Sequence, residues 1–173
     1  MQSAFSSARI LLPAKPWFIA VSLLLSLLLN LLPTRQWPGM PDCVALVLIF
    51  WSMHEHRRVG MGWAFLLGLA MDVADANLLG QHALAYVLAS YVAATLARRI
   101  LWFPLSLQAL HILVMLLAVQ LIQLCVRMSL GADFPGVTYF FGAMLGAVLW
   151  IPLNYLLLLP QYQPVEHDDN RPI

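Results

Sequence analysis

Two acidic residues stand inside an apolar stretch of the sequence, "GLAMDVADANLLGQHA", residues 68–83. Asp72 and Asp75 are three residues apart, a spacing that places both carboxyl groups on one face of a helix. Such a pair can serve general acid–base catalysis, bind an ion, or accept hydrogen bonds in a protein interior. The other residues of the chain decide among these three possibilities.

Motifs that would support catalysis or metal binding are incomplete. "HEHRR" (54–58) resembles the zinc motif HExxH, but Arg58 stands where the second histidine is needed. "HDDN" (167–170) lacks the further acids of a diphosphate–magnesium site, and the two cysteines form no CxxC. A G-x-S-x-G motif and a P-loop are both absent. We therefore predict no enzyme activity, no catalytic residue, no cofactor and no metal site.

The amino-acid composition indicates whether the chain is surrounded by water or by lipid. The chain of 173 residues is 62% hydrophobic and only 10% charged, against about 25% charged in a soluble domain. No run of basic residues suits nucleic acid. We predict an all-α integral membrane protein in which residues 1–160 form one domain of six transmembrane helices and 161–173 a short disordered cytoplasmic tail. The apolar segments are 17–33, 40–54, 61–77, 81–97, 105–127 and 136–159.

Lysine and arginine set the orientation. With a cytoplasmic N-terminus, seven basic residues lie inside and two, Arg35 and Arg127, lie outside, which accounts for all nine. The bias favours cytoplasmic positions for both termini. Arg57 and Arg58, in the hairpin "HEHRRVG", set this topology and are candidates to contact anionic lipid headgroups, the alternative being a contact with a cytoplasmic protein.

Polar residues recur at helical spacing within three of the expected spans. The stripes are Ser22, Ser26 and Asn30 on the first span, His82, Tyr86 and Ser90 on the fourth, and Gln120, Gln123 and Arg127 on the fifth. One interpretation is that they form hydrogen-bonded seams between helices, as in many membrane bundles. The other is that they line a polar cavity open to the outside.

Counted from Arg58, after which the third helix enters the membrane, Asp72 lies about 21 Å along it at 1.5 Å per residue, in the outer half of the membrane. Since an unpaired carboxylate there is costly, we expect a buried anchor bonded to groups at its own depth, namely Asn30, Gln120 or Gln123. On that basis Asp72→Asn should largely preserve assembly with a partner, whereas Asp72→Leu should weaken it.

Neighbouring residues suit this role for Asp72. Gly68, one turn earlier on the same face, would let another backbone approach, and Gly80 would let the chain turn back sharply into the fourth span. Asp75 would be solvated or would pair with Arg127.

Residues 41–91 resemble the core of the MreD family of rod shape-determining proteins. The matching features are Pro41-Asp42 opening a short helix that ends at Trp51, the turn Arg58-Val59-Gly60, and Gly68-x-x-x-Asp72 followed by Leu79-Gly80. Many relatives have Ser-Gly where this chain has Asp75-Ala76, so no family role is transferred to Asp75.

The resemblance implies a bacterial inner-membrane protein without catalytic activity. It would bind the MreC scaffold and act indirectly with MreB, RodA and a class B penicillin-binding transpeptidase in lateral peptidoglycan synthesis. The family is also similar in fold to the substrate-binding subunits of energy-coupling-factor transporters. A small-molecule-binding subunit of that type is therefore the alternative, although the AxxxA docking pattern is missing from the first span.

The topology is testable by reporter fusion. A phosphatase that works only in the periplasm should remain inactive when fused at Ile173, because the distribution of basic residues places this end in the cytoplasm. Strong phosphatase activity in intact cells would instead require an odd number of spans, and the short second segment would be the first to be rejected.

Overall fold

The computed structural model describes residues 14–32, 39–75 and 79–161. These residues form six α-helices and no strand, which confirms the predicted all-α class and the six helices. The predicted tail lies outside the described residues except for Gln161. The helices are α1 (Pro16–Asn30), α2 (Cys43–His54), α3 (Met61–Ala74), α4 (Gln81–Ile100), α5 (Leu105–Ser129) and α6 (Phe141–Leu158), with the 3-10 turns η2 (Val137–Phe140) and η3 (Leu159–Gln161) flanking α6.

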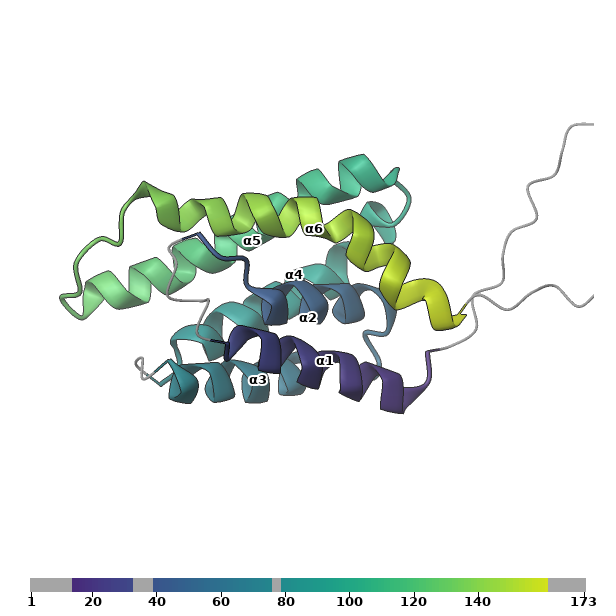
Figure 1. Cartoon of the computed structure of the whole chain (residues 1–173), viewed down its shortest axis with the longest axis horizontal. Coiled ribbons are helices and arrows are strands. Elements are labelled where there is room, and N and C mark those ends of the chain that lie inside the picture. The colour runs from purple at the N-terminus through teal and green to yellow at the C-terminus, as the bar shows by residue number, and fades with distance from the viewer. Residues whose placement is uncertain (1–13, 33–38, 76–78, 162–173) are drawn as a thin grey trace, which may run out of the picture.

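The helices run roughly along the long axis of one bundle (Figure 1). Helix α4 packs against α2, α3 and α5, and α2 also packs against α1, while α5 packs against α6. In the view of Figure 1, α1 and α3 lie below α2 and α4, with α5 and α6 above. Helices α2 and α4 thus form the centre on which the others assemble.

Helix length divides the six into two groups. Within the described residues, Gln81–Ile100, Leu105–Ser129 and Val137–Gln161 are long and apolar enough to cross a membrane. Helices α1, α2 and α3 have 15, 12 and 14 residues, which is shorter than the 17–25 expected for a span. The predicted second segment, 40–54, begins as a helix only at Cys43, and the predicted third, 61–77, ends as a helix at Ala74.

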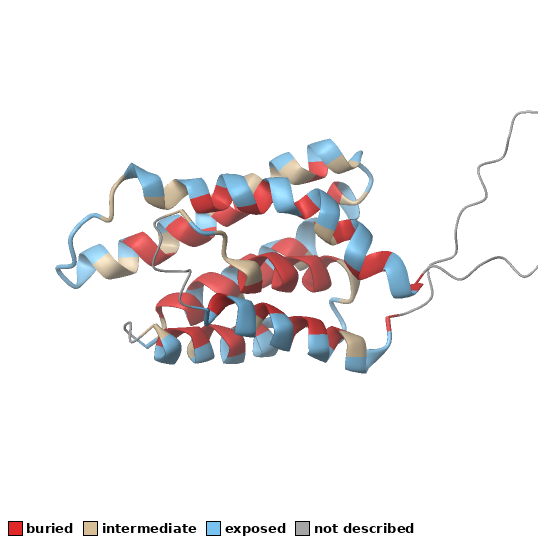
Figure 2. Cartoon of the chain, in the orientation of Figure 1, coloured by how far each residue is buried: buried red, intermediate tan, exposed pale blue. Residues whose placement is uncertain are grey.

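Helix α2 is enclosed by the rest of the protein. Every residue from Val44 to Met53 is buried, and Figure 2 shows this helix in the buried colour along its length. A helix that is hydrophobic on all sides belongs in a core. Because α2 presents no face to the outside, its 12 residues need not match the thickness of a bilayer.

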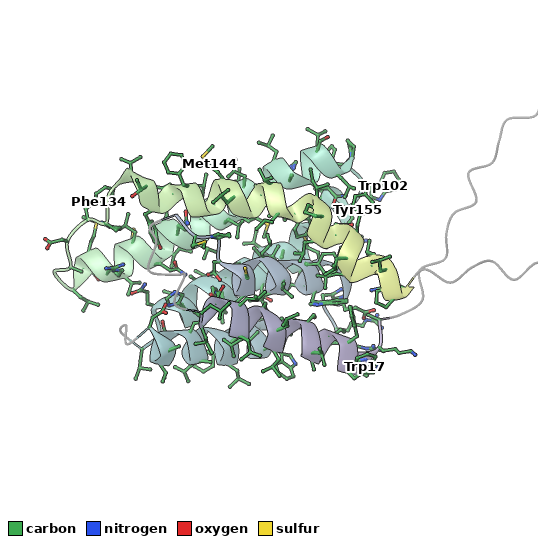
Figure 3. All side chains as sticks on the ribbon, in the orientation of Figure 1. Trp17, Trp102, Phe134, Met144 and Tyr155 are labelled. Atoms are coloured by element: carbon green, nitrogen blue, oxygen red, sulfur yellow. The ribbon has the colours of Figure 1, made fainter. Side chains whose placement is uncertain are left out.

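The outer surface of the bundle is apolar. Large side chains such as Trp17, Trp102, Phe134, Met144 and Tyr155 are more than half exposed and project outwards (Figure 3). Small residues lie inside instead. On α6, Gly142 and Gly146 are buried and on α4 so are Ala85, Ala89, Ala93 and Ala97. Small residues inside and large apolar residues outside are typical of helices packed within lipid.

Two glycines fit α3 against the start of α4. A Cβ on Gly68 would lie 2.4 Å from the Cα of Ala83, so only glycine allows these backbones to approach so closely. Gly80 has φ +106°, a conformation that L side chains rarely adopt, and it directly precedes α4. Both predicted glycine roles are confirmed.

Helix α6 is fitted closely at one end and bent at the other. A Cβ on Gly142 would lie 2.6 Å from the carbonyl oxygen of Met40, and one on Gly146 would lie 2.6 Å from a methyl group of Leu116. Pro152 lies inside the helix. Proline removes a backbone hydrogen bond and kinks a helix, and α6 changes direction in its second half (Figure 1).

The close approach at Gly68 can be tested with a matched glycine on the same helix. Gly68→Ala should lower the free energy of unfolding by about 1–3 kcal/mol because the new methyl group would meet backbone atoms, which cannot move aside easily. Gly62→Ala is the control, since a Cβ at Gly62 has no atom within 4 Å. Thermal unfolding in detergent would measure both. Equal unfolding midpoints for the two variants would contradict the proposed contact.

Candidate functional site

Asp72 forms a cap for α4 although it belongs to α3. Its Oδ1 accepts hydrogen bonds from the backbone N–H of His82 and from the His82 Nδ1, both at 2.8 Å. Its Oδ2 accepts from the backbone N–H of Gly80 at 2.7 Å and from that of Ala83 at 3.4 Å. The first N–H groups of a helix have no partner within the helix. Asp72, which is completely buried, supplies that partner.

The expected partners of Asp72 were therefore wrong. Asn30, Gln120 and Gln123 all bond elsewhere, and the acceptor capacity of Asp72 is used by the turn that follows it in sequence. The physical reason is proximity along the chain. The chain turns sharply at Gly80, and Gly68 allows the start of α4 to pack closely against α3. The first N–H groups of α4 therefore lie next to the carboxylate and occupy the positions that side chains of α5 would need.

His82 lies between two carboxylates. Its Nδ1 contacts Asp72, and its Nε2 lies 3.7 Å from Oδ2 of Asp75. The side chain of His82 is 3% exposed and that of Asp75 is 23% exposed. Asp75 therefore lies at the boundary of the bundle with the imidazole as a neighbour, and His82 links α4 to Asp72 of α3 and to Asp75 directly after that helix.

Asp42 forms the corresponding cap for α2. Its Oδ1 accepts from the backbone N–H of Ala45 at 3.0 Å and from Nδ2 of Asn30 at 2.8 Å. Its Oδ2 accepts from the hydroxyl group of Tyr86 at 2.6 Å, and Asn30 accepts from the N–H of Cys43 at 3.1 Å. One carboxylate thereby joins α1, α2 and α4.

The two caps belong to one cluster. The rings of His82 and Tyr86 meet edge to face with centroids 5.8 Å apart. We call the whole group the buried acid network; it comprises Asn30, Asp42, Asp72, Asp75, His82 and Tyr86. It joins α1, α2, α3 and α4 at the end of the bundle where α1 and α3 finish and α2 and α4 begin.

The polar stripe on α4 is a hydrogen-bonded seam, as one of the two interpretations predicted. His82 bonds to α3, Tyr86 bonds to the cap of α2, and the hydroxyl groups of Ser90 and Ser52 lie 2.8 Å apart between α4 and α2. On α1, Ser22 accepts a hydrogen bond from Nε1 of Trp51 at 2.8 Å. These residues connect helices, and the cavities between α1 and α6 and between α4 and α5 are lined mainly by apolar side chains instead.

The stripe on α5 bonds to η2, the 3-10 turn before α6. Gln120 Nε2 donates to the carbonyl of Tyr139 at 3.1 Å, and the hydroxyl of Tyr139 donates to Gln123 Oε1 at 2.8 Å. The Oε1 of Gln120 and the Nε2 of Gln123 are buried without a partner. Arg127, half-buried in the last turn of α5, lies beyond them.

Arg57 and Arg58 lie at the opposite end of the bundle, in the turn between α2 and α3. Both are exposed, as a hairpin requires. Arg58 also donates to the carbonyl of Ala14, and the N–H of Ala14 donates to Glu55 at 3.3 Å. The turn is thereby tied to the start of α1, a contact that the sequence did not suggest.

The chemistry available to the buried acid network is limited. Four donors occupy both oxygens of Asp72, and three occupy those of Asp42. Within residues 14–32, 39–75 and 79–161, no group of three or more His, Cys, Asp or Glu residues is arranged to hold a metal ion. The geometry serves to join helices.

Comparison with known proteins identifies the family of the chain. The family model for the rod shape-determining protein MreD matches residues 13–159. The chain is also 31% identical over 152 residues to the rod shape-determining protein MreD of Haemophilus influenzae, covering 82% of this chain and 89% of that protein. The chain belongs to the MreD family. No solved structure matches it.

Membership of the MreD family confirms the resemblance inferred from residues 41–91. The structure also explains three of its features physically: Asp42 caps α2, Gly68 permits a backbone contact, and Asp72 caps α4 after Gly80. Sequence reasoning did not select Asp42, His82 or Tyr86 as site residues. The signals were present in the Pro41-Asp42 helix start and in the stripe on α4.

The caps lead to a revised prediction for Asp72. Asp72→Asn should destabilise the protein nearly as much as Asp72→Leu. Each carboxylate oxygen accepts from at least one backbone N–H, so the amide NH2 would place a donor against a donor in either orientation. Each buried donor left without an acceptor costs about 1–3 kcal/mol. Thermal unfolding would measure both variants, with the partly exposed Asp75→Asn as control. An Asp72→Asn protein as stable as the wild type would contradict the cap.

Proposed function

We propose that this chain is a non-catalytic component of the cell-elongation machinery that binds the MreC scaffold and supports lateral peptidoglycan synthesis. The match of the MreD family model over residues 13–159 carries the proposal. The buried acid network supports a structural role, because its carboxylates are engaged by donors from neighbouring helices and α2 is enclosed.

The proposed location is the bacterial inner membrane, with six crossings and both termini in the cytoplasm. The apolar outer surface and the three long helices support a membrane environment. The excess of basic residues at the end carrying Arg57, Arg58, Arg98 and Arg99 supports this orientation. The network then faces the periplasm. The three short helices would lie within the bilayer by packing against the longer ones.

The proposed role in elongation is that of a membrane anchor. MreC would be the direct partner, and MreB, RodA and the class B penicillin-binding transpeptidase would be reached through it. Similarity in fold to energy-coupling-factor subunits remains a prediction. A cavity between α1 and α6 is lined by apolar side chains and by two serines that are already hydrogen-bonded, so it offers a vitamin little polar recognition.

Complementation and co-purification test the proposal together. Expressed in rod-shaped bacteria depleted of their own MreD protein, the chain should restore cell width and should retain MreC on purification. Asp72→Leu should do both less well at matched membrane abundance, because α4 loses its cap. Gly62→Ala is the neutral control. Restored shape without MreC retention would contradict the direct partner, and retention without restored shape would contradict the role in elongation.

A further inference from the structure

A cavity of about 420 Å³ opens between α1 and α6. Phe18, Leu25 and Leu29 belong to its α1 side, Leu153 and Leu156 to its α6 side, and residues of the enclosed helix α2 form its floor. We call it the α1–α6 groove. It is separate from the buried acid network, and it is larger than the cavity of about 260 Å³ between α4 and α5.

The lining of the groove selects hydrocarbon. Its hydroxyl groups are those of Ser22 and Ser26, and each donates to a carbonyl one turn earlier on α1, at 2.8 Å. Ser22 also accepts from Trp51. A polar ligand would leave its own groups unpaired in such a site, which is costly. An apolar occupant has no polar groups that would lose hydrogen bonds in this site.

The length of the groove corresponds to one leaflet of a bilayer. Its lining on α1 extends from Phe18 to Leu29, which is about 16 Å at 1.5 Å per residue. The hydrocarbon core of a bilayer is about 30 Å thick. A single acyl chain of one leaflet spans about half of that thickness and therefore matches the groove from end to end.

A partner helix suits the groove less well. Helices in membranes approach one another through small residues, and Gly142 and Gly146 of α6 are already used against Met40 and Leu116. Apart from the buried Ser22 and Ser26, the sides of the groove consist of leucine, valine and phenylalanine, with Pro152 at the bend of α6. Flexible hydrocarbon can follow such an irregular surface.

Basic residues lie at the end of the groove where α1 begins. Lys15 is exposed and precedes Phe18 by three residues, which places it one turn away at the start of the helix. Arg58 is tied to the adjacent carbonyl of Ala14, and Glu55 is the one acidic neighbour described there. The local charge is therefore positive, and each basic residue near the surface attracts anionic lipid.

We propose that the α1–α6 groove binds one acyl chain of an anionic phospholipid, with its phosphate group beside Lys15 and Arg58. The site goes beyond the proposed function and does not depend on it. The lipid would pack on Leu46 and Val47 at the floor of the groove, and would thereby hold α1 and α6 at a set distance.

Native mass spectrometry of the full chain tests occupancy. In a titration with phosphatidylglycerol in detergent, the wild type should retain one additional tightly bound lipid compared with the groove variants Ser26→Leu and Val21→Phe. Both substitutions place side-chain atoms in the groove. Val73→Phe is the matched control, because Val73 is 67% exposed on α3 and does not line the groove. Unchanged lipid retention in correctly folded groove variants would overturn the proposal.

The headgroup component has its own control. Lys15→Gln should reduce the preference for phosphatidylglycerol over phosphatidylcholine about fivefold, whereas Arg98→Gln, in the last turn of α4, should leave it unchanged. Equal binding of both lipids by the wild type would overturn the choice of an anionic lipid.

Trp51 can report where the acyl chain lies. It is fully buried and bonds to Ser22 of the groove. In a variant whose only tryptophan is Trp51, phosphatidylglycerol brominated in mid-chain should quench its fluorescence, and Ser26→Leu should weaken that quenching. If groove variants instead abolish retention of a co-expressed membrane partner and leave quenching unchanged, the groove is a helix-docking site and the lipid proposal is wrong.

Discussion

Two helices of this bundle begin inside the protein, and their first N–H groups need acceptors there. Val44 and Ala45 in the first turn of α2 are fully buried, and so, nearly, are Gln81, His82 and Ala83 at the start of α4. Neither water nor lipid supplies hydrogen bonds at such positions. Asp42 and Asp72 meet the need with carboxylates, which favour the positive end of a helix dipole. The sharp turn at Gly80 and the backbone contact at Gly68 are the geometric conditions for the second cap.

The caps also establish which helices are neighbours. Lipid provides no hydrophobic force that drives one apolar helix against another, so small residues and polar bonds specify the arrangement. Helix α4 carries several residues of both kinds. Its alanines are buried in the bundle, while His82, Tyr86 and Ser90 bond to α3, to the cap of α2, and to α2 itself. Helix α2 can therefore remain short and apolar, since its position is determined from both sides.

Sequence alone was sufficient for the class, the six helices and the roles of Gly68 and Gly80, because hydrophobic periodicity and glycine have direct geometric meaning. It was insufficient for the partner of Asp72. Depth in a membrane follows from residue counting, and several helices offer polar groups at the same depth. Depth alone therefore does not distinguish among Gln120, Gln123 and Asn30 as hydrogen-bond partners. Which helix lies adjacent depends on the turn at residues 79–81 and on contacts between distant residues. The hydrogen bond between Arg58 and Ala14 could not be predicted for the same reason, because every residue has a backbone carbonyl and its acceptor role does not depend on residue type.

The buried acid network and the α1–α6 groove represent two different kinds of construction in one small bundle. Where α3 meets α4, a residue without a side chain and a carboxylate with four donors leave one possible spacing between helices. Where α1 faces α6, large apolar side chains leave a space of about 420 Å³. The first arrangement resists displacement because buried donors would lose their acceptor, and the second can change its width at little cost because dispersion contacts are individually weak. Buried hydrogen bonds thus hold α1 to α4 of this MreD family member together, whereas α6 faces α1 across the groove through apolar side chains.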